Sequence, residues 1–201
     1  MRKIIVVTML SLDNVMQGPG DPAEDTSEGF TVGGWTVPYA DDFFGKVLDE
    51  EMNKPFDLLL GRKTFEIFAS YWRQHDDEGP GPGINKAVKY VASNTLTSHD
   101  WGKCVFFESA ALVKEIKKLK QQDGPDLWVY GSSNLIQTLL KNDLVDEFWL
   151  RTFPVILGNG KKLFAEGTPP AAFILTDSKT SPAGVVFASY QRAGEVKSGS
   201  F

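Results

Sequence analysis

The stretch Asp57-Leu58-Leu59-Leu60-Gly61-Arg62-Lys63-Thr64-Phe65-Glu66 decides the fold that we expect for this chain. Residues 58–60 form an apolar run that is too short for a helix and suits a strand buried on both faces. Gly61 allows a tight turn, and Thr64 can lie in the first turn of a helix, where free backbone N–H groups attract an anion. Arg62 and Lys63 add two cations, so the stretch predicts a phosphate-binding turn. An ordinary strand-to-helix turn with exposed basic residues is the alternative interpretation.

The same pattern occurs again in the second half of the chain. Asp126 to Leu135 reads as a strand, a small-residue turn with Gly131, Ser132 and Ser133, and a helix start. Ser93 and Asn94 follow a third short strand, at residues 89–92. Ligands of parallel sheets bind beyond the carboxyl ends of the strands, so these turns predict one shared nucleotide site. For the serines, helix capping is the competing role.

Three groups of residues carry a resemblance to a known family. Gly61-Arg62-Lys63-Thr64-Phe65 resembles the G-R-x-T-aromatic signature of the dihydrofolate reductase superfamily. Gly131-Ser132 stands where that superfamily has a Gly-Gly turn under the cofactor pyrophosphate, with serine as a departure. Leu144-Val145-Asp146-Glu147, the run from Pro154 to Gly160, and Ser11-Leu12-Asp13 resemble its riboflavin-biosynthesis reductase branch. The resemblance extends from Arg2 to Arg192.

The resemblance implies a three-layer α/β/α dihydrofolate reductase-like fold and the cofactor NADPH. The expected activity is that of an NADPH-dependent reductase resembling the enzyme that reduces 5-amino-6-(5-phosphoribosylamino)uracil. A dihydrofolate or pterin reductase and a non-catalytic nucleotide-binding module are the alternatives. Arg62 and Lys63 are candidates for the 2′-phosphate, because guanidinium and ammonium groups bind phosphate. The other cofactor candidates are Ser93 and Asn94 on the adenosine side, and Gly61, Thr64, Gly131, Ser132 and Ser133 at the pyrophosphate.

Residues for substrate binding and catalysis are less well defined. A dihydrofolate reductase has a pterin-binding carboxylate on its first long helix. Counting back from Gly61 without gaps, the corresponding position in this sequence is at or near Gly45, which has no carboxylate. Asp42 could supply the carboxylate instead, or it could only cap the helix with Asp41. The resemblance suggests that Asp13 binds substrate hydroxyls, although an aspartate also favours turns.

Three further side chains are candidates for substrate binding. Arg151 lies in an apolar strand and needs a partner. That partner could be a substrate phosphate or carboxylate, or Arg151 could reach a sheet edge or a dimer partner. Trp35 and Tyr39 lie in the long loop of residues 19–39 and suit a lid over a flat ring, although Trp35 could instead anchor the loop to the core.

Strands alternate with helices along most of the chain. The pattern predicts strands at 3–9, 58–60, 89–92, 105–107, 127–130 and 147–153, and helices at 43–52, 64–71, 110–122 and 133–141. A Gly/Pro-rich acidic loop is expected at 75–83, and a closing antiparallel hairpin at 173–179 and 185–192. Such an order predicts a mostly parallel sheet covered on both sides. We expect one domain, residues 1–193, followed by a loose tail, residues 194–201.

Composition limits the partners. The chain has 201 residues and a formal charge of −5, which gives no electrostatic case for binding nucleic acid or an anionic membrane. Cys104 is the single cysteine, so we expect no intrachain disulfide, and a reducing cytoplasm is the natural setting. With only His75 and His99 beside it, no metal site is expected. Many aromatic residues in the sixth strand and the hairpin predict a homodimer that binds a small-molecule substrate.

Overall fold

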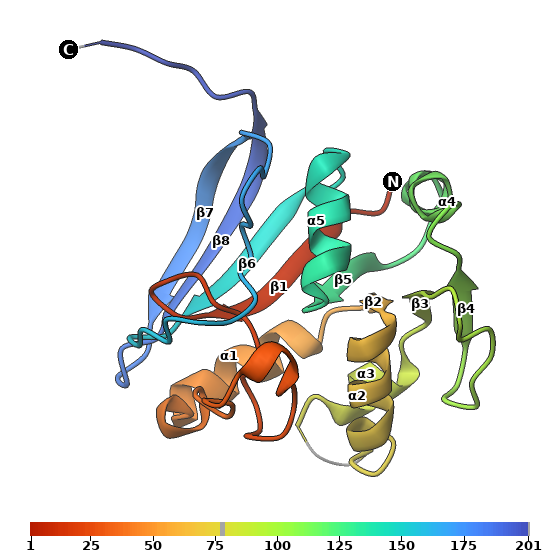
Figure 1. The fold of residues 1–201 in the computed structure, drawn as a ribbon, viewed down its shortest axis with the longest axis horizontal. Helices are drawn as coiled ribbons and strands as arrows, with labels where there is room; N and C mark the ends of the chain where they lie inside the picture. The colour runs from red at the N-terminus through yellow and green to blue at the C-terminus, as the bar shows by residue number, and fades with distance from the viewer. Residues whose placement is uncertain (77–78, 201) are drawn as a thin grey trace.

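One mixed sheet forms the centre of the protein. The structure is a computed structural model that describes residues 1–76 and 79–200. Its strands are β1 (Ile4–Leu10), β2 (Phe56–Gly61), β3 (Lys89–Ala92), β4 (Cys104–Phe107), β5 (Asp126–Tyr130), β6 (Glu147–Thr152), β7 (Ala172–Thr180) and β8 (Val186–Gly194). They lie in the order β4-β3-β2-β5-β1-β6-β8-β7 (Figure 1). The first six strands pair in parallel, and β8 pairs antiparallel with both β6 and β7.

Helices cover both faces of this sheet. They are α1 (Asp42–Met52), α2 (Arg62–Trp72), α3 (Gly81–Lys86), α4 (Leu112–Gln121) and α5 (Ser133–Lys141). Figure 1 shows α4 and α5 on one side of the sheet and α1, α2 and α3 on the other. The three-layer α/β/α arrangement, the mostly parallel sheet and the C-terminal hairpin are therefore confirmed.

Strand β1 shows why the sheet is buried on both faces. Its side chains alternate between two cores: Ile4 and Val6 pack with α4 and α5, whereas Ile5 and Val7 pack with α2 and α3. An apolar run without polar alternation is typical of a central parallel strand. A third core, around Phe153, joins α1 and the 19–39 loop to β8.

The structure corrects two expected boundaries. Residues 75–83 were expected to form a loop, but α3 begins at Gly81, and residues 77–78 lie outside the described part. This helix forms despite its Gly/Pro-rich sequence because Ile84 is buried in the second core and proline is tolerated in a first helical turn. Helix α2 begins at Arg62, not at Thr64. The 19–39 loop contains two short 3₁₀ helices, Ser27–Gly29 and Val37–Tyr39.

The aromatic side chains behind the expected homodimer pack within one chain. Phe148 contacts Phe173 edge-on at 5.0 Å between ring centroids, and Phe187 lies 5.6 Å from Phe44. The edge strand β7 instead exposes the aliphatic residues Ile174 and Leu175. A homodimer therefore stays a prediction. The exposed aliphatic residues of β7 now support it, in place of the aromatic residues.

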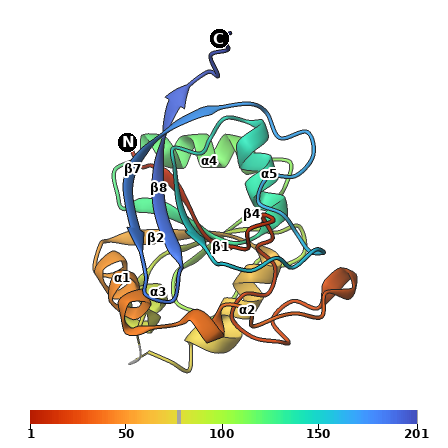
Figure 2. The ribbon, with the colours of Figure 1, turned by 90° about the vertical axis from the view of Figure 1, so that its left-hand side faces the viewer.

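The C-terminal residues leave the body of the protein. Residues 195–200 have no helix or strand, and Figures 1 and 2 show this segment extending away from the sheet beyond β8. Within the described residues, no helix combines the length and the apolar character that a membrane crossing requires. The same part of the chain holds no cluster of His, Cys, Asp or Glu side chains that could bind a metal ion.

Candidate active site

Two turns from distant parts of the chain touch at the carboxyl edge of the sheet. Ser132 Oγ accepts a hydrogen bond from the Gly61 backbone N–H at 2.8 Å and donates one to Thr64 Oγ1 at 2.6 Å. A Cβ atom on Gly61 would lie 2.8 Å from Ser132 Oγ, so residue 61 must be glycine for this approach. Gly131 and Ser132 both adopt positive φ, 63° each, which is unusual for a serine. The first two motifs of the sequence are thus locked together.

Both turns present an uncapped helix start. No side chain caps α2 at Gly61 or α5 at Ser132. The first backbone N–H groups of a helix have no partner within it and carry the positive end of the helix dipole, so they bind anions. Lys63 in the first turn of α2 has no carboxylate partner among the described residues, whereas Arg62 pairs with Glu66 at 2.9 Å. Within the described residues, this edge therefore combines two uncapped helix starts with one cation that has no carboxylate partner.

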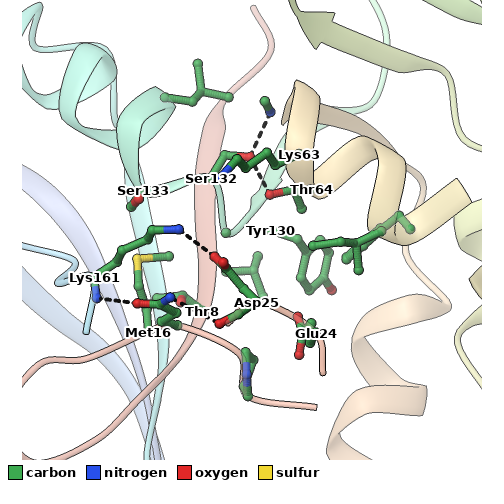
Figure 3. Close-up of a pocket in the computed structure, with 18 of the residues that line it drawn as sticks. Thr8, Met16, Glu24, Asp25, Lys63, Thr64, Tyr130, Ser132, Ser133 and Lys161 are labelled. Atoms are coloured by element: carbon green, nitrogen blue, oxygen red, sulfur yellow. Dashed lines mark hydrogen bonds and ion pairs between the residues drawn. The ribbon is translucent and has the colours of Figure 1, made fainter. Parts of the chain in front are cut away.

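A cavity of about 670 Å³ opens beside these turns. Its lining comes from α1 and α2, from the starts of α4 and α5, and from the beginning of the 19–39 loop. Figure 3 shows the Ser132–Thr64 hydrogen bond at one part of its wall and the Lys161–Asp25 ion pair at another. Of the predicted site residues, the cavity lining includes Gly61, Arg62, Lys63, Thr64, Gly131, Ser132, Ser133 and Arg151.

The part of the cavity beyond β5 has apolar and aromatic walls, and we call it the inner chamber. Its lining residues are Leu48, Met52, Phe68, Trp72, Tyr130 and Arg151. Tyr130 contacts both helices that form the walls of the chamber. Its hydroxyl lies 4.0 Å from Sδ of Met52 in α1, and its ring centroid lies 5.9 Å from that of Phe68 in α2. Burial raises the pKa of the Tyr130 hydroxyl above its ordinary value, so the phenol stays neutral.

Arg151 is the charged residue among the described residues that line the inner chamber. Its side chain is almost completely buried, and its Nη2 binds the carboxylate of Glu51 near the end of α1. The Nε and Nη1 atoms have no acceptor among the described protein groups. Glu51 holds the guanidinium plane in place, and the Tyr130 hydroxyl lies beside the same guanidinium.

Carboxylates line the outer part of the cavity. Lys161 Nζ contacts Asp25 Oδ2 at 2.5 Å and Ser27 Oγ at 2.7 Å, which fastens the 19–39 loop to the segment after β6. Glu24 also lines the cavity, and its Oε2 accepts a hydrogen bond from the Gly20 N–H at 2.6 Å. Burial raises the pKa of the Glu24 carboxyl, so this group holds its proton more readily than a free glutamate does.

Two of the cofactor candidates lie away from the cavity lining, and so do the catalytic candidates Asp42 and Asp13. Ser93 is buried and its Oγ accepts hydrogen bonds from the N–H groups of Thr95 and Leu96, so it holds its own turn. Asn94 Oδ1 accepts from the Ser109 N–H at 2.8 Å, and it is Ser109 that lines the cavity. Asp42 is exposed in the first turn of α1, and the helix cap is Asp41.

The loop candidates have structural surroundings. The Trp35 indole is buried against Phe153 in the third core, and its N–H donates to the Gln17 carbonyl at 2.8 Å. Tyr39 packs on the same Phe153 ring at 5.9 Å. Neither residue lines the cavity, which is covered instead by residues 17–20, Glu24, Asp25 and Glu28. The surroundings of Trp35 therefore favour the anchoring role, and a lid role for Trp35 and Tyr39 stays a prediction.

Asp13 closes a turn between distant segments. Its carboxylate accepts hydrogen bonds from Ser11 Oγ at 2.6 Å, Leu157 N at 3.0 Å and Gly158 N at 2.8 Å. The Ser11 hydroxyl and these backbone donors lower the pKa of Asp13 to about 2. Asp13 is not part of the cavity lining, so the geometry favours a structural role.

This role predicts an effect of Asp13→Ala on stability. We expect the free energy of unfolding at neutral pH to fall by about 1 kcal/mol, since three hydrogen bonds are lost from a partly exposed carboxylate. Because the native pKa lies below the unfolded one, the carboxylate stabilises the fold above pH 3.8, and this contribution is lost as the pH falls from 3.8 to about 2. Urea unfolding measures both effects, with exposed Asp123→Ala as the control. Unchanged stability together with lost substrate binding would instead favour the role implied by the resemblance.

Sequence reasoning missed several residues of the site. Glu51 was not considered because its partner Arg151 is 100 positions away, and no local pattern connects them. Met52 has the spacing of an ordinary core position of an amphipathic helix, and Phe68 and Trp72 carried no functional signal in the sequence. Lys161 and Asp25 carried no signal in the sequence.

Comparison with known proteins identifies the family. The family model of the RibD C-terminal domain matches residues 2–187. The chain belongs to the RibD C-terminal domain family. A relative in this size range is the uncharacterized protein YyaP of Bacillus subtilis (strain 168), which is 31% identical over 201 residues and covers 96% of each chain.

Solved structures bear out the fold that is expected of a RibD C-terminal domain. A putative riboflavin biosynthesis protein from Shewanella sp. PV-4 superposes with a TM-score of 0.65 at 24% identity, over 95% of this chain and 99% of that one. Dihydrofolate reductase from Enterococcus faecalis, solved with NADP(H) and the ligand RAB-propyl, gives a TM-score of 0.56 at 15% identity, over 94% and 96%. The expected dihydrofolate reductase-like fold is therefore confirmed.

Proposed function

We propose that this protein is an NADPH-dependent reductase of a small molecule with a conjugated C=N or C=O bond. The observation that carries the proposal is the meeting of two uncapped helix starts, at Gly61 and Ser132, beside the unpaired Lys63 on one wall of a large cavity. Membership of the RibD C-terminal domain family supports a reductase. The substrate stays open between a phosphorylated ribosylamino-pyrimidine and a pterin.

The residues of this edge fit a dinucleotide phosphate. The N–H groups at the starts of α2 and α5 would hold the pyrophosphate, with the hydroxyls of Thr64 and Ser133 beside them. Lys63, helped by Arg62, would hold the 2′-phosphate. The close contact between Gly61 and Ser132 keeps the two helix starts at a fixed separation. NADPH, when bound, supplies the hydride.

The chain supplies a water-poor pocket and a group that can hold a proton. The inner chamber is apolar apart from Tyr130 and the Arg151–Glu51 pair, so it limits access of water to a bound ring. Helix α1 faces the cavity with Leu48 and Met52, whereas Gly45 is exposed, and the α1 carboxylate beside the chamber, Glu51, is already paired with Arg151. Glu24 is the lining carboxyl whose pKa is raised by burial, and we propose it as the residue that keeps a proton available to the substrate.

Cofactor selection is the first test. NADPH should bind more tightly than NADH, and Lys63→Ala should weaken NADPH binding by about 1–3 kcal/mol, the scale of a hydrogen bond to a charged group. Arg62→Ala should have a smaller effect, because Glu66 already engages that guanidinium. Fluorescence titration with both cofactors measures this, with exposed Lys117→Ala on α4 as the control. Equal affinities of the wild type for NADPH and NADH would contradict the proposed role of Lys63.

Oxidation of NADPH separates the remaining possibilities. Turnover with a ribosylamino-pyrimidine phosphate or a pterin identifies a reductase, whereas tight NADPH binding without turnover of any carbonyl or imine substrate indicates a non-catalytic nucleotide-binding module.

Two further expectations belong to the proposal. A homodimer through the exposed edge of β7 is checked by light scattering, which would show a monomer mass if the expectation is wrong. A cytoplasmic location follows from the single cysteine.

A further inference from the structure

Ser132 turns its hydroxyl away from its own helix. The residue is the N-cap of α5, a position where a serine side chain commonly accepts a hydrogen bond from the helix, yet this side chain makes no capping hydrogen bond. Its Oγ lies instead 2.8 Å from the backbone nitrogen of Gly61 and 2.6 Å from Thr64 Oγ1, both at the start of α2. The hydroxyl of Ser132 therefore serves the other helix start and not its own.

The directions of these two hydrogen bonds leave one proton unused. A backbone N–H can only donate, so the Ser132 oxygen accepts from Gly61, and the single Ser132 proton goes to Thr64 Oγ1. Two hydroxyls hold two protons, and the contact between them uses one. Among the hydrogen bonds of the described residues, none uses the proton of Thr64. The Thr64 hydroxyl therefore has a proton to donate to a ligand.

Open space lies beside the Thr64 hydroxyl. Thr64 and Gly131 both line the cavity, and Figure 3 shows Thr64 and Ser132 hydrogen-bonded in its wall. Apart from neighbours in the chain, the atoms nearest to a Cβ built on Gly131 would be Thr64 Oγ1 at 3.8 Å and Cγ2 at 3.9 Å. Because Gly131 has no side chain, this space stays open to an atom that accepts a hydrogen bond.

The backbone of Ser132 has a conformation that glycine adopts more easily. Its φ is 63° and its ψ is 70°, a left-handed conformation that costs free energy for a residue with a side chain. Glycine at position 132 would remove this cost, together with both contacts of the hydroxyl. Serine is thus unfavourable for the backbone alone, and its hydroxyl is the feature that calls for a role.

We propose that Ser132 is a positioning residue, whose hydroxyl directs the Thr64 proton toward an oxygen of a diphosphate bound between the starts of α2 and α5. Ser132 acts through Thr64, and its own side chain does not touch the ligand. A hydroxyl that accepts a hydrogen bond donates its own proton more strongly, and a charged oxygen is the acceptor that gains most from this. The inference rests on the proposed function, because that function places a dinucleotide phosphate at this edge.

Isothermal titration calorimetry with ADP-ribose tests the proposal. This probe has the diphosphate but lacks the nicotinamide and the 2′-phosphate of NADPH. Ser132→Gly should fold, because glycine adopts this φ freely, and should bind ADP-ribose about fivefold more weakly or worse, the scale of one hydrogen bond. Ser132→Ala keeps the Cβ atom beside Gly61, removes only the hydroxyl, and should show the same loss. Ser70→Ala removes an α2 hydroxyl outside the cavity lining and should leave the affinity unchanged.

A double-mutant cycle shows whether Ser132 acts through Thr64. Thr64→Val keeps the shape of the side chain without its hydroxyl and should weaken ADP-ribose binding about tenfold or more, the scale of a hydrogen bond to a charged group. In this background Ser132→Gly should cause less than about a twofold further loss, since no proton remains to be directed. A packing role of Ser132 would persist beside valine. Thr64→Ser retains the hydroxyl, so it should bind within about threefold of the wild type and restore the full effect of Ser132→Gly.

The proposal is overturned if the wild type does not bind ADP-ribose, or if either Ser132→Gly or Ser132→Ala binds it like the wild type. It is also overturned if the effects of Ser132→Gly and Thr64→Val multiply in the double variant. These titrations involve no hydride transfer, so they are independent of the turnover test. The expected ADP-ribose results without NADPH oxidation would contradict the reductase and leave the role of Ser132 standing. NADPH oxidation with unchanged ADP-ribose binding by Ser132→Gly would do the reverse.

Discussion

Replacing Trp35 with Ala should lower the free energy of unfolding by about 3–5 kcal/mol, the range of large-to-small changes of buried aromatic residues. The side chain is 7% exposed, lies edge-on to Phe153 at 5.4 Å, and donates a hydrogen bond to the Gln17 carbonyl. For a chain of this size, the melting temperature should fall by about 10 °C. Urea unfolding and calorimetry measure the loss.

The same variant distinguishes an anchor from a lid. Since Trp35 does not line the cavity, the folded fraction of Trp35→Ala should bind NADPH like the wild type. Val37→Ala is a suitable control, because Val37 lies in the same loop and is exposed. A small change in stability together with a large loss of cofactor or substrate binding would show that Trp35 moves over the site after all.

Replacing Arg151 with Met should destabilise the fold by about 3–5 kcal/mol, because Glu51 is left as a buried charge without a partner. The double variant Glu51→Gln/Arg151→Met should recover most of this loss, since two neutral side chains of similar size replace the pair. A double-mutant cycle by urea unfolding gives the coupling between the two residues.

The exposed pair of Lys179 and Glu50 provides the matched control for this cycle. These side chains are 3.6 Å apart and about half exposed, so Lys179→Met should cost less than about 1 kcal/mol. If Arg151→Met costs no more than Lys179→Met, the Arg151–Glu51 contact is not a buried ion pair in solution.

The cofactor side of the site could be predicted because its signals are local. Gly61 and Gly131 each end a short apolar strand, and the carboxyl ends of parallel strands meet at one edge of the sheet. The serine at position 132 was counted as a departure, yet its hydroxyl makes the contact with Gly61 and Thr64 that joins the two turns. The local sequence predicts the positions of the two turns. Only the contacts with Gly61 and Thr64 show that a serine fits at position 132.

The substrate side could not be predicted because it depends on long-range pairing. Arg151 was recognised as needing a partner, but nothing near it in the sequence indicates Glu51. Asp13 was assigned to the substrate by resemblance, whereas its hydrogen bonds go to the backbone of Leu157 and Gly158. The sequence left Trp35 open between a lid and a core anchor, and the packing on Phe153 favours the anchor.

The position of β1 in the sheet has a consequence for how the chain reaches its fold during synthesis. This strand is synthesised before the other strands of the described sheet, but its two neighbours are β5 and β6, which end at Tyr130 and Thr152. The apolar segment from Ile4 to Leu10 therefore has an unpaired edge until the chain has been made as far as Thr152. Pairings that are distant in sequence form slowly, and an unpaired apolar strand promotes aggregation while it waits. We expect the nascent chain to depend on chaperone protection until β6 has emerged.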